Sequence, residues 1–171
     1  MRRRSRPVTP ALPLRVALAQ IRCPWADTRG NLERMATWAE RAKSEGARLA
    51  VFPELCVSGI CKDERLTSVT ETLDGPSVSF VSSLARRLGL AIGFGFSEKA
   101  DGMPYNAYAV VEPDGTLAGV YRKNHIPDVN PGFYEKMFFK PGNLGYPVFQ
   151  TKFAKVGVYI CYDRHFPEGA R

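Results

Sequence analysis

The first half of the chain alternates between short apolar runs and apolar residues at helical spacing. The runs predict strands at residues 14–21, 48–52 and 90–96. The helical spacing predicts a helix over 31–46, with Asn31 as its N-cap, and a second helix over 76–89. Glycines on one face of the third strand indicate that another layer approaches it closely.

The second half contains a turn signal and a long loop. Pro113-Asp-Gly115 separates apolar runs at 106–111 and 116–122, and such a turn predicts a hairpin. Residues 124–145 are rich in proline, glycine and aromatics and are too long for a simple connection, so we interpret them as a site-forming loop. Strands are also expected at 147–151 and 155–160. This order of elements predicts an α/β sandwich whose sheet is mostly buried on both faces.

Composition narrows the class of protein. With 171 residues, of which 44% are hydrophobic and 24% charged, the chain has the length and balance of one globular domain. No apolar run approaches the ~20 residues of a membrane span, so no membrane partner is expected. Four cysteines do not suggest a disulfide framework, and we predict a reducing, cytoplasmic location.

The net charge of +7 is concentrated at the start of the chain. Arginines among the first six residues contribute four of these charges and leave +3, well mixed in sign, over the rest. We therefore predict that residues 1–13 form a basic disordered arm and that residues 14–171 form the folded domain. Polyanion binding is the alternative for the arm. No stripe of basic and aromatic residues supports it further along, so no nucleic-acid partner is expected.

Cys161 carries the strongest chemical signal. It follows the predicted strand 155–160 and precedes Phe166-Pro-Glu168, where a proline would open a helix. At such a strand-to-helix corner the thiol projects from the sheet edge. The backbone N–H groups that follow can lower its pKa and hold an oxyanion. A packed core cysteine is the alternative.

Two charged residues occupy the same structural position as Cys161. Glu54 follows one predicted strand and Lys123 follows another, and sites in open α/β sheets gather beyond strand ends. A carboxylate, an ammonium and a thiol would suit acyl transfer. Taken singly, Glu54 could instead cap a helix, and Lys123 could be a solvated surface lysine.

A metal site is not predicted. Cysteine and histidine could supply sulfur and nitrogen ligands, but their spacings fit no tight zinc pattern. The residues tested are Cys56, Cys61, His125, Cys161 and His165.

Three ordered blocks, at residues 52–55, 121–127 and 158–168, resemble the signatures of the nitrilase, or carbon–nitrogen hydrolase, superfamily. The resemblance runs from about Leu14 to the last residue. It implies that Glu54 is the general base, Lys123 the oxyanion stabiliser and Cys161 the nucleophile. It also implies the N-terminal part of a four-layer α-β-β-α sandwich, a chemistry that needs no cofactor, and a homo-oligomer in the full-length form.

Residues 124–127, 132–139 and 141–143 resemble the N-carbamoyl-amino-acid, β-ureidopropionate and N-carbamoylputrescine hydrolases. This resemblance implies that Glu135 lies near the substrate's amide nitrogen, that the Tyr162 N–H helps to hold the oxyanion, and that Arg164 grips a substrate carboxylate. The alternatives are a surface role for Glu135 and an internal salt bridge for Arg164.

The expected activity is therefore thiol-dependent hydrolysis of a linear N-carbamoyl compound or small amide, with release of ammonia. A nitrilase is the enzymatic alternative. The chain stops ten residues after Cys161, whereas members of the superfamily continue well beyond that point. We therefore expect a C-terminally truncated chain, and the remaining alternative is an inactive module that only pairs with a homologue.

Overall fold

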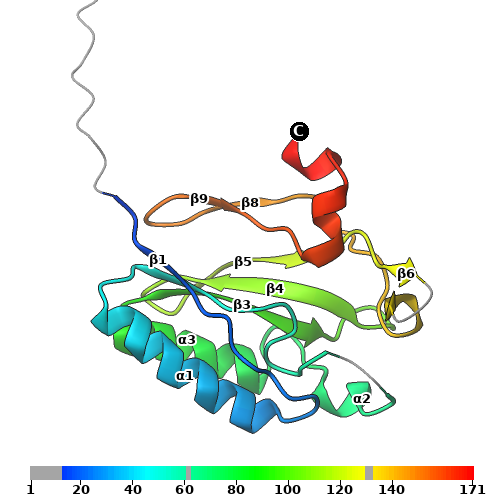
Figure 1. The fold of residues 1–171 in the computed structure, drawn as a ribbon, viewed down its shortest axis with the longest axis horizontal. Coiled ribbons are helices and arrows are strands. Elements are labelled where there is room, and N and C mark those ends of the chain that lie inside the picture. The colour runs from blue at the N-terminus through cyan, green and yellow to red at the C-terminus, as the bar shows by residue number, and fades with distance from the viewer. Residues whose placement is uncertain (1–12, 61–62, 130–132) are drawn as a thin grey trace, which may run out of the picture.

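The computed structural model describes residues 13–60, 63–129 and 133–171. The predicted basic arm therefore lies, except for Pro13, outside the described residues. Figure 1 shows three layers, with helices below a central sheet and a short hairpin above it. Within the described residues, no helix combines the length and the apolar character that a membrane span requires.

The central sheet has five strands in sequential order. They are β1 (Val16–Leu18), β2 (Leu49–Val51), β3 (Ala91–Glu98), β4 (Tyr105–Val111) and β5 (Leu117–Arg122). The first three run parallel, and β4 is antiparallel to both of its neighbours. Because β5 therefore runs in the same direction as β2, these two strands end at the same edge of the sheet.

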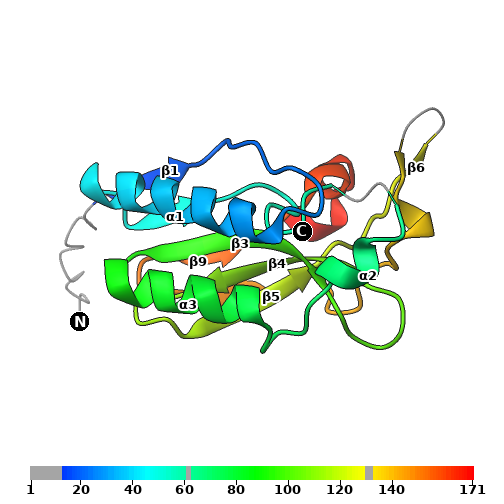
Figure 2. The same ribbon diagram turned by 90° about the horizontal axis from the view of Figure 1, so that it is seen from below.

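Helices α1 (Thr28–Ser44) and α3 (Pro76–Leu88) lie side by side across one face of the sheet (Figure 2). Their apolar stripes, which include Met35 and Val81, pack with Phe94 into the main core. The predicted bounds of α3 are confirmed, and it ends at Gly89 in the left-handed conformation. A short helix, α2 (Leu66–Val69), lies between them in sequence.

The predicted start of the first helix is wrong. Asp27, not Asn31, is the N-cap, and its carboxylate accepts a hydrogen bond from the Gly30 N–H at 3.1 Å. Asn31 is completely buried inside α1, where its side-chain amide donates to the carbonyls of Pro24 and Val57. Both residue types cap helices well, so the sequence signal did not distinguish them.

A hairpin of β8 (Val148–Gln150) and β9 (Lys155–Gly157) covers part of the other face of the sheet. Its Phe149 packs with Tyr108 and Tyr121 in a second cluster. The described chain thus supplies a helical layer and two β layers, in agreement with the expected N-terminal part of an α-β-β-α sandwich.

The segment around Cys161 differs from the prediction. Two 3₁₀ helices, η2 (Cys161–His165) and η3 (Glu168–Ala170), take the place of an α-helix opening at Pro167. Phe166 between them is extended, because a residue that precedes proline is disfavoured in the helical region. The chain therefore leaves the first helical turn before it enters the second.

The predicted site-forming loop has structure of its own. It contains β6 (Asp128–Val129) and β7 (Phe133–Tyr134), which pair as a small hairpin, followed by η1 (Glu135–Met137). In Figure 2 this hairpin projects from the end of the molecule. Residues 130–132 lie outside the described residues, and with them Gly132, the first residue of one block used for the family resemblance.

Candidate active site

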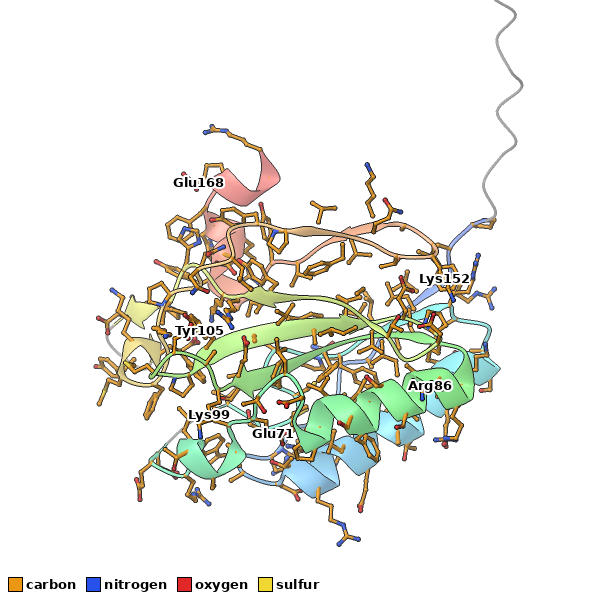
Figure 3. All side chains as sticks on the ribbon, turned by 180° about the vertical axis from the view of Figure 1, so that it is seen from behind. Glu71, Arg86, Lys99, Tyr105, Lys152 and Glu168 are labelled. Atoms are coloured by element: carbon orange, nitrogen blue, oxygen red, sulfur yellow. The ribbon has the colours of Figure 1, made fainter. Side chains whose placement is uncertain are left out.

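Three chain segments meet at one end of the sheet. Glu54 follows β2, Lys123 follows β5, and Cys161 begins η2. In Figure 3, Tyr105 marks the end of the molecule where β4 begins, and Lys152 marks the opposite end. The strand ends therefore bring together charged residues that are far apart in the sequence, as the strand pattern predicts.

Lys123 is the centre of the cluster. Its Nζ lies 2.7 Å from Glu54 Oε1 and 2.8 Å from Glu135 Oε2, and its side chain is completely buried. Burial works to lower the pKa of Lys123, but the two carboxylates outweigh it and raise the pKa above the usual 10.5. Lys123 is therefore a charged ammonium at neutral pH, and the surface-lysine alternative does not describe it. Glu54, which binds this ammonium, does not act as a helix cap.

Glu135 approaches Lys123 from η1, and its side chain is only 18% exposed. Burial raises the pKa of Glu135, the Lys123 ammonium lowers it, and the Glu54 carboxylate raises it again, so the net shift is upward. Burial is the largest of these effects, and with the Glu54 carboxylate it outweighs the Lys123 ammonium, which explains the sign. The structure thus brings Glu135 into the cluster rather than leaving it on the loop surface.

Asn106 is a member of the cluster that the sequence analysis missed. Its side-chain Nδ2 donates to Glu54 Oε1 at 2.7 Å, and the residue is completely buried. The only sequence signal is an amide inside the apolar run of β4, between Tyr105 and Ala107. Such a residue in a buried strand requires polar partners, which here are provided by the site.

Cys161 is exposed and has a φ of 45°, in the left-handed region. It lines a cavity of about 290 Å³ together with Glu54, so it is not a packed core cysteine. Cys56, completely buried beside Met35, has that role.

The expected lowering of the thiol pKa by the strand-to-helix corner is not observed. Burial and the Glu54 carboxylate raise the pKa of Cys161 above 9.0, although Lys123 opposes them. The corner is a 3₁₀ helix of only five residues, so it presents fewer aligned amides to the sulfur than a longer α-helix would. The thiol is therefore protonated at neutral pH.

Asp163, also missed by the sequence analysis, anchors the segment that carries Cys161. Its buried carboxylate accepts hydrogen bonds from Tyr121 Oη at 2.7 Å, from the His125 backbone N–H at 2.8 Å and from the Ile160 N–H at 3.1 Å. Tyr121 and His125 flank Lys123 in sequence. One carboxylate thus ties the segment of Cys161 to the segment of Lys123.

Tyr162 and Arg164 follow Cys161 in the chain. The Tyr162 ring packs edge-on against Phe166, and the oxyanion role of its backbone N–H stays a prediction. Arg164 is exposed and forms no ion pair with the residues that the structure describes, so the internal salt bridge is not found there. Its positive charge works to lower the pKa of Cys161, which is consistent with a place beside the site.

Across residues 13–60, 63–129 and 133–171, no group of three or more histidine, cysteine or acidic side chains is arranged to hold a metal ion. Cys61, one of the ligands considered from the sequence, lies outside these ranges.

Comparison with known proteins agrees with this geometry. The family model described as carbon-nitrogen hydrolase matches residues 15–171. The chain belongs to the carbon-nitrogen hydrolase family.

Similar family members include N-carbamoylputrescine amidases of two plants. The protein of Arabidopsis thaliana is 51% identical over 85% of this chain and 50% of its own length. That of Solanum tuberosum is 39% identical over 91% of this chain and 53% of its own length. A crystal structure of a carbon-nitrogen hydrolase from Helicobacter pylori G27 superposes with a TM-score of 0.80, at 31% identity, over 92% of this chain and 55% of that one. The chain thus spans about half the length of the curated relatives it matches.

Proposed function

We propose that this chain carries the catalytic groups of a thiol-dependent hydrolase of non-peptide C–N bonds, which cleaves a linear N-carbamoyl compound or small amide. The observation that supports it is the buried Lys123 ammonium between Glu54 and Glu135, with Glu54 and Cys161 on one cavity. A protonated thiol and a carboxylate on one cavity are the groups that general-base activation of a nucleophile requires.

In the proposed mechanism, Glu54 takes the proton from the Cys161 thiol, and the sulfur adds to the carbonyl carbon of the substrate. Lys123 and the Tyr162 N–H stabilise the negative charge on the carbonyl oxygen. The proton held by Glu54 passes to the leaving nitrogen, the C–N bond breaks, and ammonia departs from a thioester. Glu54 then takes a proton from water, and the resulting hydroxide cleaves the thioester and restores the thiol.

Glu135 favours an amide or carbamoyl substrate over a nitrile. Its carboxylate can accept a hydrogen bond from a leaving –NH₂ group, which a nitrile lacks. For an N-carbamoyl amine, the acyl group departs as a carbamate, which decomposes to carbon dioxide and the amine. The similarity to N-carbamoylputrescine amidases supports the same class of substrate. Arg164 is proposed to bind a substrate carboxylate where one is present.

The proposal is tested by measuring ammonia release from N-carbamoylputrescine, N-carbamoyl-β-alanine and a simple aliphatic nitrile. We expect release from a carbamoyl compound and its loss in Cys161→Ala. Release that persists in Cys161→Ala, or from the nitrile alone, would contradict the proposal. No turnover together with stable association with a full-length homologue would instead favour the inactive module. Assembly into homo-oligomers and a cytoplasmic location remain predictions.

A further inference from the structure

We propose that Asn106 is a positioning residue that orients the Glu54 carboxylate toward the Cys161 thiol. The inference rests on the proposed function, because it assigns Glu54 the role of base. It starts from a shared acceptor. The Asn106 Nδ2 and the Lys123 Nζ both lie 2.7 Å from Oε1 of Glu54.

Two donors on one oxygen fix the rotation of a carboxylate. Among the described residues none donates to the second oxygen, Oε2, which is therefore left to accept the thiol proton. A charged donor and a neutral donor also stabilise the ionised carboxylate, the form that acts as a base. Lys123 alone would leave Glu54 free to turn about this single contact.

Asn106 is held rigidly enough for this role. It lies in β4, opposite Ser97 of β3, in the interior of the five-stranded sheet. Its backbone carbonyl accepts a hydrogen bond from the Lys123 N–H at 2.9 Å. The same residue thus fixes the backbone of Lys123 and the side chain of Glu54.

The side-chain oxygen of Asn106 indicates that an asparagine at this position does not serve the packing of the sheet. Asn106 Oδ1 is buried and has no hydrogen-bond partner among the described residues. An unpartnered buried oxygen costs stability, and leucine, of similar volume, would remove it. The hydrogen bond to Glu54 is the contact that offsets this cost. Asn106 also works to lower the pKa of Glu135, so its amide influences both carboxylates.

The test follows alkylation of Cys161 by iodoacetamide in the full chain as a function of pH, with the modified peptide quantified by mass spectrometry. This reaction needs no substrate, so it remains informative whether or not the chain hydrolyses amides. Where Glu54 assists the thiol, the alkylation rate of Cys161 falls toward acidic pH as the Glu54 carboxylate gains a proton. This fall is the acid limb of the pH profile. Glu54→Gln, which removes the base, defines the profile without this acid limb.

The variants are Asn106→Leu, which lacks the donor, and Asn106→Asp, which keeps the shape but adds a negative charge. We expect both to move the acid limb to higher pH, by about one pH unit for leucine and further for aspartate, since the ionised carboxylate loses a donor. Ser97→Ala is the matched control, because it removes a neighbouring buried hydroxyl that contacts Thr70 and not the carboxylates. Its profile should equal that of the wild type.

Cys56 serves as an internal reference, because it is completely buried and reacts only when the fold opens. We expect Asn106→Leu to keep Cys56 protected and to retain the wild-type melting temperature. A wild-type acid limb in Asn106→Leu would overturn the proposal. Exposure of Cys56 in both Asn106 variants would also overturn it, by showing that the residue is needed for folding. If the acid limb shifts in the Asn106 variants but the wild type releases no ammonia, the proposed function alone would be overturned.

Discussion

The charges of the residues at the site do not balance. Lys123 provides one buried ammonium for the carboxylates of Glu54 and Glu135. The two acids would repel each other without it, and the cation would be costly to bury without them. The three charges are therefore interdependent, and the loss of one should affect the other two.

Replacement of Lys123 by methionine tests this interdependence. We expect Lys123→Met to lower the free energy of unfolding by about 3 kcal/mol, because it leaves two facing, partly buried carboxylates without a cation. Urea denaturation at neutral pH measures the loss. The double variant Lys123→Met/Glu135→Gln should recover part of it, because the repulsion is removed. Equal losses in the single and double variants would show that repulsion is not the cause.

The pH dependence of stability should report Glu135. A carboxyl group whose pKa is raised in the folded chain binds its proton more tightly there than in the unfolded chain. The folded state therefore loses stability as the pH rises from the ordinary 4.5 through the raised value. We expect Glu135→Gln to gain stability relative to the wild type over that window, in urea titrations at several pH values. A constant difference across the window would contradict the upward shift.

Secondary-structure elements position these residues through close backbone approaches. Gly95 in β3 lies directly against the segment that carries Glu54, and a Cβ atom placed there would come within 2.3 Å of the Leu55 nitrogen. A close approach was expected at these glycines, but at Gly95 it comes from the continuation of the neighbouring strand β2 and not from another layer. The missing side chain of Gly95 thus sets where Glu54 lies.

Gly95→Ala should therefore affect both the fold and the site. We expect a loss of about 2 kcal/mol in the free energy of unfolding from overpacking against backbone atoms, and slower alkylation of Cys161 because Glu54 is displaced. Gly157→Ala is the matched control, because a Cβ atom at that strand position meets nothing within 4 Å. An equal effect of the two substitutions would contradict the proposed contact.

The sequence predicts elements well where their ends carry a single, unambiguous signal. Pro76 and Gly89 bound α3 as expected, since proline suits a first turn and glycine the left-handed cap. Asp27 and Asn31 compete as caps of α1, and the choice depends on Asn31 being buried against Val57, a contact 26 residues away. The turn at Cys161 depends on hydrogen bonds that Asp163 accepts from Tyr121 and His125, which local spacing does not reveal.

At the scale of the whole molecule, the tendency of sites to gather beyond strand ends predicts that Glu54 and Lys123 meet. It does not predict the site residues that the interior of the sheet supplies. Asn106 lies inside a strand, where the apolar pattern conceals a single amide. Its role depends on β4 lying beside β3, which packs against the Glu54 segment. That adjacency is a property of the sheet order, and no local pattern encodes it.

The two β layers leave apolar side chains on the surface. Leu18 on the edge strand β1 is 79% exposed, and Val148 on β8 is 63% exposed. An exposed apolar edge strand favours self-association. We expect Leu18→Lys to raise the protein concentration at which light scattering begins, while the free energy of unfolding changes by less than about 0.5 kcal/mol. Unchanged scattering would show that this edge does not drive association.

The backbone at Cys161 also affects how an inactive form of the protein should be prepared. A φ of 45° is comfortable for glycine, whereas any side chain there costs roughly 1–2 kcal/mol. Alanine in place of the cysteine removes the sulfur but keeps that conformational penalty, whereas glycine removes both. A glycine-substituted chain is thus the more relaxed scaffold in which to look, by crystallography, for binding of the proposed amide substrate.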